Sequence, residues 1–125
     1  ATKIWAAEPQ GHDDWKRSLA AGRIETNEPG TRSICDALLT PSPGEITFAV
    51  GKDRLQGGFT VSDYEARAAV RFAATQMKLV VEPGGAVALA CALRGLPDEM
   101  RGQRVGVVVT GGNIDPAMLA EILVH

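Results

Sequence analysis

The sequence predicts an α/β fold with a mainly parallel sheet and flanking helices. Short apolar runs alternate with amphipathic segments along the chain, as in strands linked by crossover helices. One of these runs, Val105–Val109, has no polar alternation and is predicted to be a strand covered on both faces. The 125 residues fit one domain or part of a larger one.

The first half of the chain begins with a predicted strand over Ile4–Ala7. A helix is expected from Asp13 or Asp14, either of which can cap it, to about Ala21, where Gly22 ends it. Three later segments are shorter or ambiguous: a short helix over Ser33–Leu39, an unassigned stretch over Glu45–Asp53 and an extended piece over Phe59–Val61.

The second half is predicted to be mainly helical. Ser62–Glu65 has the spacing of a capping box and predicts a helix that continues to about Met77. Ala86–Leu93 is apolar all round, which indicates a buried helix. A last helix is expected after Asp115, with Pro116 at its first position, where the missing amide costs nothing.

Composition excludes several classes of protein. Hydrophobic residues make up 45% and charged residues 22% of the chain, as in ordinary globular proteins. The net charge of -2 gives no electrostatic reason for a nucleic-acid or membrane partner. No apolar run reaches the roughly 18 residues of a membrane span. Cys35 and Cys91 are interpreted as core residues, and a reducing cytoplasm is the expected location.

The N-terminus runs from Ala1 directly into the first predicted strand, and no signal peptide is expected. We therefore expect a piece of a longer protein, a processed chain or one half of a split protein.

Two loops are candidates for ligand binding, because ligands of parallel α/β folds gather at the carboxyl ends of strands. Thr110–Asn113 offers a hydroxyl, two glycines and an amide, and glycines let a flat ligand approach the backbone. A generic strand-to-helix turn explains the same residues. Glu82, at the end of an apolar run, needs partners or a raised pKa, unless it is an acid facing helix amides.

The other loop contains Glu8, His12 and Asp14. Its two carboxylates can converge on a hard cation with help from a backbone carbonyl, although a capped helix with solvated acids also explains them. A zinc site is not expected, because only one histidine is nearby.

Four segments resemble those of serine/threonine dehydratases and serine racemases, which are fold-type-II pyridoxal-phosphate enzymes. The segments follow in family order: Ala7–Asp14, Thr31–Leu38, Lys78–Ala86 and Val107–Asp115. The resemblance implies that residues 1–125 form the C-terminal portion of the large, tryptophan synthase β-like domain. It departs from the family pattern at Cys35, Ala37 and Gly84.

The resemblance also implies site residues and cofactors. The Thr110 hydroxyl would bond the ring nitrogen of pyridoxal 5'-phosphate, with Gly111 and Glu82 beside the ring. Glu8, the carbonyl of His12 and Asp14 would hold Mg²⁺ or Ca²⁺, with Mn²⁺ as a third candidate. The region of Asp36, Thr40 and Ser42 would border the substrate.

The catalytic Schiff-base lysine of the family has no counterpart among the four lysines: Lys3, Lys16, Lys52 and Lys78. No catalytic residue is therefore assigned, and the chain alone is expected to be inactive without the missing N-terminal segment or a companion chain. The implied activity is that of a β-hydroxy-amino-acid ammonia-lyase, acting on serine, threonine or 3-hydroxyaspartate. A serine racemase and a non-catalytic binding module are the alternatives, and the full enzyme is expected to be a homodimer.

Overall fold

Two parallel strands form the centre of the computed structural model, which describes residues 1–125. Strand β1 spans Ile4–Pro9 and strand β2 spans Leu55–Val61. Pro9 pairs with Val61, so both strands end at the same edge of the sheet. The α/β class with parallel strands is confirmed, and β2 begins four residues before the predicted extended piece.

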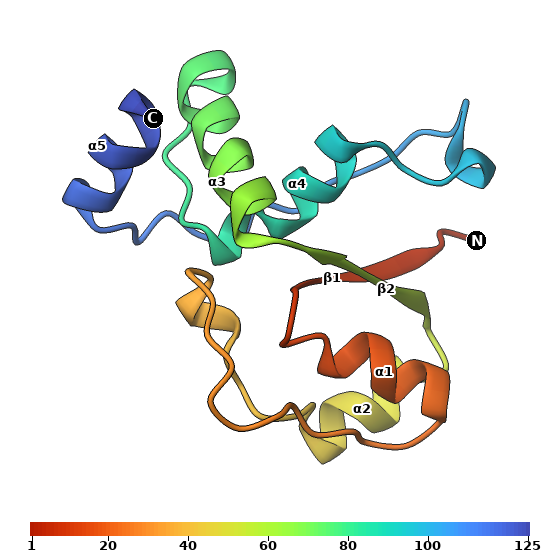
Figure 1. Ribbon diagram of the computed structural model, residues 1–125. Helices are drawn as coiled ribbons and strands as arrows, with labels where there is room; N and C mark the ends of the chain where they lie inside the picture. Colours follow the sequence, from red (N-terminus) through yellow and green to blue (C-terminus); the bar gives the residue numbers. More distant parts are fainter.

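Helices cover both sides of the sheet (Figure 1). On one side lie α1 (Asp14–Ala21) and α2 (Glu45–Gly51), and on the other lie α3 (Asp63–Phe72) and α4 (Val87–Arg94), with α5 (Pro116–Val124) beside α3. Helices α1 and α3 therefore begin just beyond the ends of the two strands. None of the helices has the length and apolar character needed to cross a membrane.

The hydrophobic core lies on the α3–α4 side of the sheet and is built mainly from small side chains. Its thirteen buried members are Cys35, Val61, Ala66, Ala69, Val70, Ala73, Val81, Ala86, Val87, Leu89, Ala90, Cys91 and Ile122. Both cysteines are core residues, as predicted, and burial raises the pKa of each thiol.

The strongest helix predictions are confirmed. Helix α1 ends at Gly22, whose φ of 72° is left-handed. The Ser62–Glu65 capping box is present at the start of α3. Beyond Phe72 the helix continues as a π-helical turn, Ala73–Met77, and Lys78 ends it at a φ of 60°. At α5, the Asp115 side chain accepts the amides of the first turn.

Two uncertain segments are resolved by tertiary contacts. The ambiguous stretch Glu45–Asp53 contains α2. The short helix predicted over Ser33–Leu39 is only a 3-10 turn, Asp36–Leu38. Its first residues, 33–35, are not helical, and there the Ser33 hydroxyl and the Ile34 amide both donate to the Asp63 carboxylate, at 2.6 and 3.2 Å.

Two further 3-10 turns lie on either side of α4. Gly84–Ala86 leads directly into α4, so the predicted Ala86–Leu93 helix is preceded by a 3-10 turn, and its α-helical part begins and ends one residue later than predicted. Asp98–Met100 lies in the connection that follows α4.

The predicted strand Val105–Val109 is wrong. Residues 104–115 contain no helix or strand, and Val108 is 72% exposed. The apolar sequence fits a covered strand, but the only sheet in the chain consists of β1 and β2. A strand needs a neighbour that supplies ladder hydrogen bonds, and this segment has none.

Candidate cofactor and cation sites

Glu8 lies at the end of β1, and its carboxylate caps α1. Oε1 accepts the amide of Trp15 at 2.9 Å and Oε2 accepts the amide of Lys16 at 3.0 Å. Asp13 occupies the N-cap position but makes no side-chain cap bond. The prediction that Asp13 or Asp14 caps this helix is therefore wrong, because the backbone brings the Glu8 carboxylate onto the free amides instead.

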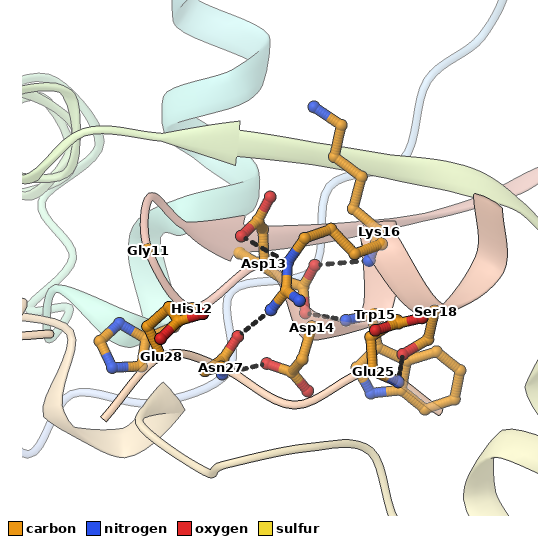
Figure 2. Close-up of polar contacts among 12 residues, drawn as sticks. Gly11, His12, Asp13, Asp14, Trp15, Lys16, Ser18, Glu25, Asn27 and Glu28 are labelled. Atoms are coloured by element: carbon orange, nitrogen blue, oxygen red, sulfur yellow. Dashed lines mark hydrogen bonds and ion pairs between the residues drawn. The ribbon is translucent and has the colours of Figure 1, made fainter. Parts of the chain in front are cut away.

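Asp14 and Asn27 form a buried polar pair next to this cap (Figure 2). The Asn27 side-chain nitrogen donates to Asp14 Oδ1 at 2.8 Å and to the Thr40 carbonyl at 2.9 Å. Arg17 donates to the Asn27 side-chain oxygen and pairs with Asp13 at 3.2 Å. The start of α1 is thus tied to two later segments of the chain.

The electrostatics of this cluster disfavour the charged form of Glu8. Burial raises the pKa of Glu8 to about 7. The hydrogen bonds from the two backbone amides lower this pKa, and the negative charges of Asp14 and Asp13 raise it further. Neither Glu8 nor Asp14 takes part in an ion pair. Two buried carboxylates therefore lie near each other without a counter-charge from the chain.

His12 is buried in the same loop, but its imidazole points away from Asp14 (Figure 2). Its Nε2 lies 3.2 Å from the Thr31 hydroxyl, and its Nδ1 has no hydrogen-bond partner. No group of three or more His, Cys, Asp or Glu side chains is placed to hold a metal ion. The expected cation set thus depends on the His12 carbonyl as a third ligand.

The second candidate site is the contact between two glycine-containing loops. The Glu82 amide donates to the Gly111 carbonyl at 3.0 Å, and the Thr110 amide donates to the Gly85 carbonyl at 3.4 Å. A β-carbon on Gly85 would lie 2.6 Å from the Gly111 oxygen, and one on Gly112 would lie 2.6 Å from the Val80 oxygen. These glycines are therefore required by loop packing as well as by any ligand.

Thr110 is exposed, and its hydroxyl makes no hydrogen bond within the chain. The half-buried Glu82 carboxylate lies against Gly111, in space that a β-carbon there would need. The residues implied for pyridoxal phosphate thus present a free hydroxyl and a carboxylate beside a side-chain-free backbone. A hydroxyl that can donate, with a carboxylate beside it that can accept, fits one edge of a flat heteroaromatic ring.

No lysine lies at this loop pair to form a Schiff base. All four lysines are exposed. Lys78, the nearest in sequence to Glu82, is turned towards the end of α3, where its Nζ donates to the Thr75 carbonyl at 2.7 Å.

Asn27 and Asp63 are polar residues whose positions the sequence did not predict. Asn27 lies in an Asn-Glu-Pro-Gly sequence that indicates only a turn, and Asp63 lies inside a capping box. Both make their important contacts across more than ten residues. A single sequence carries no signal for such contacts.

Comparison with known protein families identifies the family to which the chain belongs. Residues 1–111 match the family of pyridoxal-phosphate dependent enzymes, and the chain belongs to that family.

Two relatives and one solved structure show which enzymes the chain resembles. The chain is 40% identical over 121 residues to the L-threo-3-hydroxyaspartate ammonia-lyase of Pseudomonas sp, covering 96% of this chain and 37% of that protein. It is 37% identical to the serine racemase of Dictyostelium discoideum, over 97% of this chain and 38% of the relative. The crystal structure of a threonine deaminase from T.th. superposes with a TM-score of 0.82 at 40% identity, over 91% of this chain and 41% of that structure. The chain thus spans about two fifths or less of the length of these relatives.

Proposed function

We propose that this chain is part of a pyridoxal-phosphate-dependent ammonia-lyase acting on β-hydroxy amino acids. The observation that carries the proposal is the free Thr110 hydroxyl beside Gly111 and Glu82, within a chain that belongs to the cofactor's family. The 40% identity to a hydroxyaspartate ammonia-lyase favours a hydroxy amino acid as substrate. The lysine and the phosphate-binding loop would come from residues outside this chain.

Pyridoxal phosphate supplies an electron sink when the α-proton of an amino acid is removed. Thr110 would hold the ring nitrogen through a neutral hydroxyl, which does not stabilise a protonated ring as a carboxylate would. A weaker sink suits prompt departure of the β-hydroxide, and the products are a 2-oxo acid and ammonia. Gly111 would leave the ring face clear. Glu82 would fix the loop through the hydrogen bond that its backbone amide donates to the Gly111 carbonyl.

Two substitutions at Thr110 test this role in the chain combined with a segment that carries the lysine. Thr110→Val should lower the rate of 2-oxo acid release from 3-hydroxyaspartate by at least about tenfold, because one hydrogen bond is lost. Thr110→Ser, the matched control, retains the hydroxyl and should retain the rate. Because Thr110 is exposed, neither change should alter the unfolding midpoint.

The same assay separates the alternatives. Release of D-serine from L-serine, with little oxo acid, would favour a racemase, which the 37% identity to a serine racemase keeps as the second candidate. An unchanged rate in Thr110→Val would reject the ring-nitrogen role. A complex that binds the cofactor and releases neither product would indicate a non-catalytic binding module.

We also propose a Mg²⁺ or Ca²⁺ ion, or Mn²⁺, at Glu8, the His12 carbonyl and Asp14. Oxygen donors suit these hard cations, and a cation would relieve the repulsion between two buried, unpaired carboxylates. Each Glu8 oxygen accepts one amide and retains a second lone pair for a cation.

Calorimetric titration with Ca²⁺ tests the cation proposal independently of activity. Asp14→Asn should abolish the binding heat, while Asp53→Asn, which removes an exposed acid without hydrogen bonds, should leave it unchanged. Absence of Ca²⁺, Mg²⁺ and Mn²⁺ binding to the parent chain would contradict the proposal.

A further inference from the structure

Asn27 joins three segments that are distant in sequence. Its side-chain nitrogen bridges Asp14 Oδ1 and the Thr40 carbonyl, at 2.8 and 2.9 Å. Its backbone amide donates to the Pro41 carbonyl at 2.7 Å. The side chain is 7% exposed, so this junction is shielded from water. Rotation of the Asp14 carboxylate cannot occur without disturbing a donor that also holds the Thr40–Pro41 backbone.

The segment held by Asn27 leads directly to the candidate cofactor loops. Residues 36–38 pack against residues 84–86, and a β-carbon on Gly84 would lie 3.4 Å from that of Ala37. The neighbouring Gly85 packs in turn against Gly111. Contacts are therefore continuous from the Asp14 carboxylate, through Asn27 and residues 36–41, to the loop that carries Thr110.

We propose that Asn27 is a positioning residue that couples cation binding at Asp14 to the conformation of residues 36–41. A cation on Asp14 would fix the carboxylate, Asn27 would transmit this order to the Thr40–Pro41 backbone, and the segment beside Gly84 would become more rigid. This coupling rests on the proposed cation site, and it assigns to Asn27 a role that neither a turn residue nor a simple core residue would have.

Hydrogen–deuterium exchange with and without Ca²⁺ tests the coupling in the whole chain. In the parent, Ca²⁺ should slow exchange both in residues 8–17 and in residues 36–42. In Asn27→Ala, protection of residues 8–17 should remain, while the Ca²⁺-dependent slowing in residues 36–42 should fall by about fivefold or disappear. Calorimetry should show Ca²⁺ affinity for Asn27→Ala reduced by a similar factor, since coupling is reciprocal.

Two further variants separate coupling from loss of structure. Ser18→Ala removes another buried hydrogen bond of α1, from the Glu25 amide at 2.8 Å, without touching Asp14 or Thr40. It should leave the Ca²⁺ response of residues 36–42 intact. Asn27→Asp keeps the shape and adds a carboxylate, so Ca²⁺ should bind at least as tightly while the response of residues 36–42 is still lost.

The outcomes distinguish this coupling from the proposed function. Full Ca²⁺ responses of residues 36–42 in Asn27→Ala and Asn27→Asp would overturn the coupling and leave the cation site standing. Loss of that response in Ser18→Ala would also overturn it, because general destabilisation would then be the cause. No Ca²⁺ response in residues 8–17 of the parent would reject the cation site and the coupling together. The proposed ammonia-lyase function would still stand, because it is tested separately by the release of 2-oxo acid.

Discussion

Helices α1 and α3 begin in equivalent places, each just beyond the end of a paired parallel strand, yet their N-termini are stabilised differently. At α3, Ser62 and Glu65 cap the helix from within its own first turn. At α1, the cap is Glu8, which reaches the amides from the end of β1 across seven and eight residues. One cap is local and partly exposed, and the other is long-range and buried.

The pKa values of the two capping carboxylates, Glu8 and Glu65, are therefore shifted in opposite directions. Hydrogen bonding to the Ser62 amide lowers the pKa of Glu65, and Arg94 adds to the effect. Burial raises the pKa of Glu8 to about 7, although it also accepts two amides. A buried cap thus gains hydrogen bonds while its charge loses hydration, whereas a partly exposed cap keeps both.

The largest expected effect is at the buried cap. Glu8→Ala leaves two helix amides without acceptors and should lower the free energy of unfolding by about 2 kcal/mol. Urea denaturation in the presence of a chelator measures this. Glu45→Ala, which removes an exposed first-turn acid of α2 without hydrogen bonds, should cost much less. An equal loss in both variants would show that Glu8 is not a specific cap.

The local cap of α3 should contribute less. Ser62→Ala removes the hydroxyl that accepts the Glu65 amide at 3.2 Å and should cost about 1 kcal/mol in the same denaturation. Ser62→Thr retains the hydroxyl and should recover most of this loss. A loss in Ser62→Ala larger than that in Glu8→Ala would reverse the comparison.

Helix α5 provides a third, exposed cap. Asp115 accepts the amides of Ala117 and Met118 at 2.7 and 3.1 Å. Asp115→Ala should cost about 0.5 to 1 kcal/mol, because solvent can replace these bonds. Glu99→Ala is the control, since that acid makes no hydrogen bond or ion pair. A loss above about 2 kcal/mol, the upper end for such caps, would mean that exposure does not separate strong from weak caps.

The smallest effect is the pH dependence from Glu65. Its folded pKa lies below the ordinary value of 4.5, so it stabilises the fold above that pH and loses its contribution as pH falls through the folded pKa. The difference in unfolding midpoint between the parent and Glu65→Gln should therefore be constant from about pH 6 to 7 and shrink below about pH 4.5. A difference that grows on acidification would contradict the direction of this shift.

The parts of the fold that were predicted correctly depend on short-range patterns. The capping box at Ser62–Glu65, the left-handed stop at Gly22 and the proline start of α5 each involve residues within one turn of the helix. Val105–Val109 has an equally clear pattern but forms no strand, because hydropathy indicates a preference for burial and cannot supply a neighbouring strand.

The candidate sites were predictable only in part. The resemblance selected Glu8, Asp14, Glu82 and Thr110; the structure places Glu8 near Asp14, and Glu82 against Gly111, the residue after Thr110. The resemblance did not predict that Glu8 would cap α1. It also did not predict that the close contact with Gly111 would require a glycine at Gly85. Both facts depend on backbone segments that meet only after folding.

The sequence by itself determined the α/β class, most of the helix boundaries and the membership of a pyridoxal-phosphate enzyme family, because propensities, caps and motifs act over a few residues. The tertiary structure alone decided which donors each buried carboxylate receives and placed Asn27 between Asp14 and Thr40. Hydrogen bonds between segments far apart in sequence depend on how the strands and helices pack, and no local pattern records that packing.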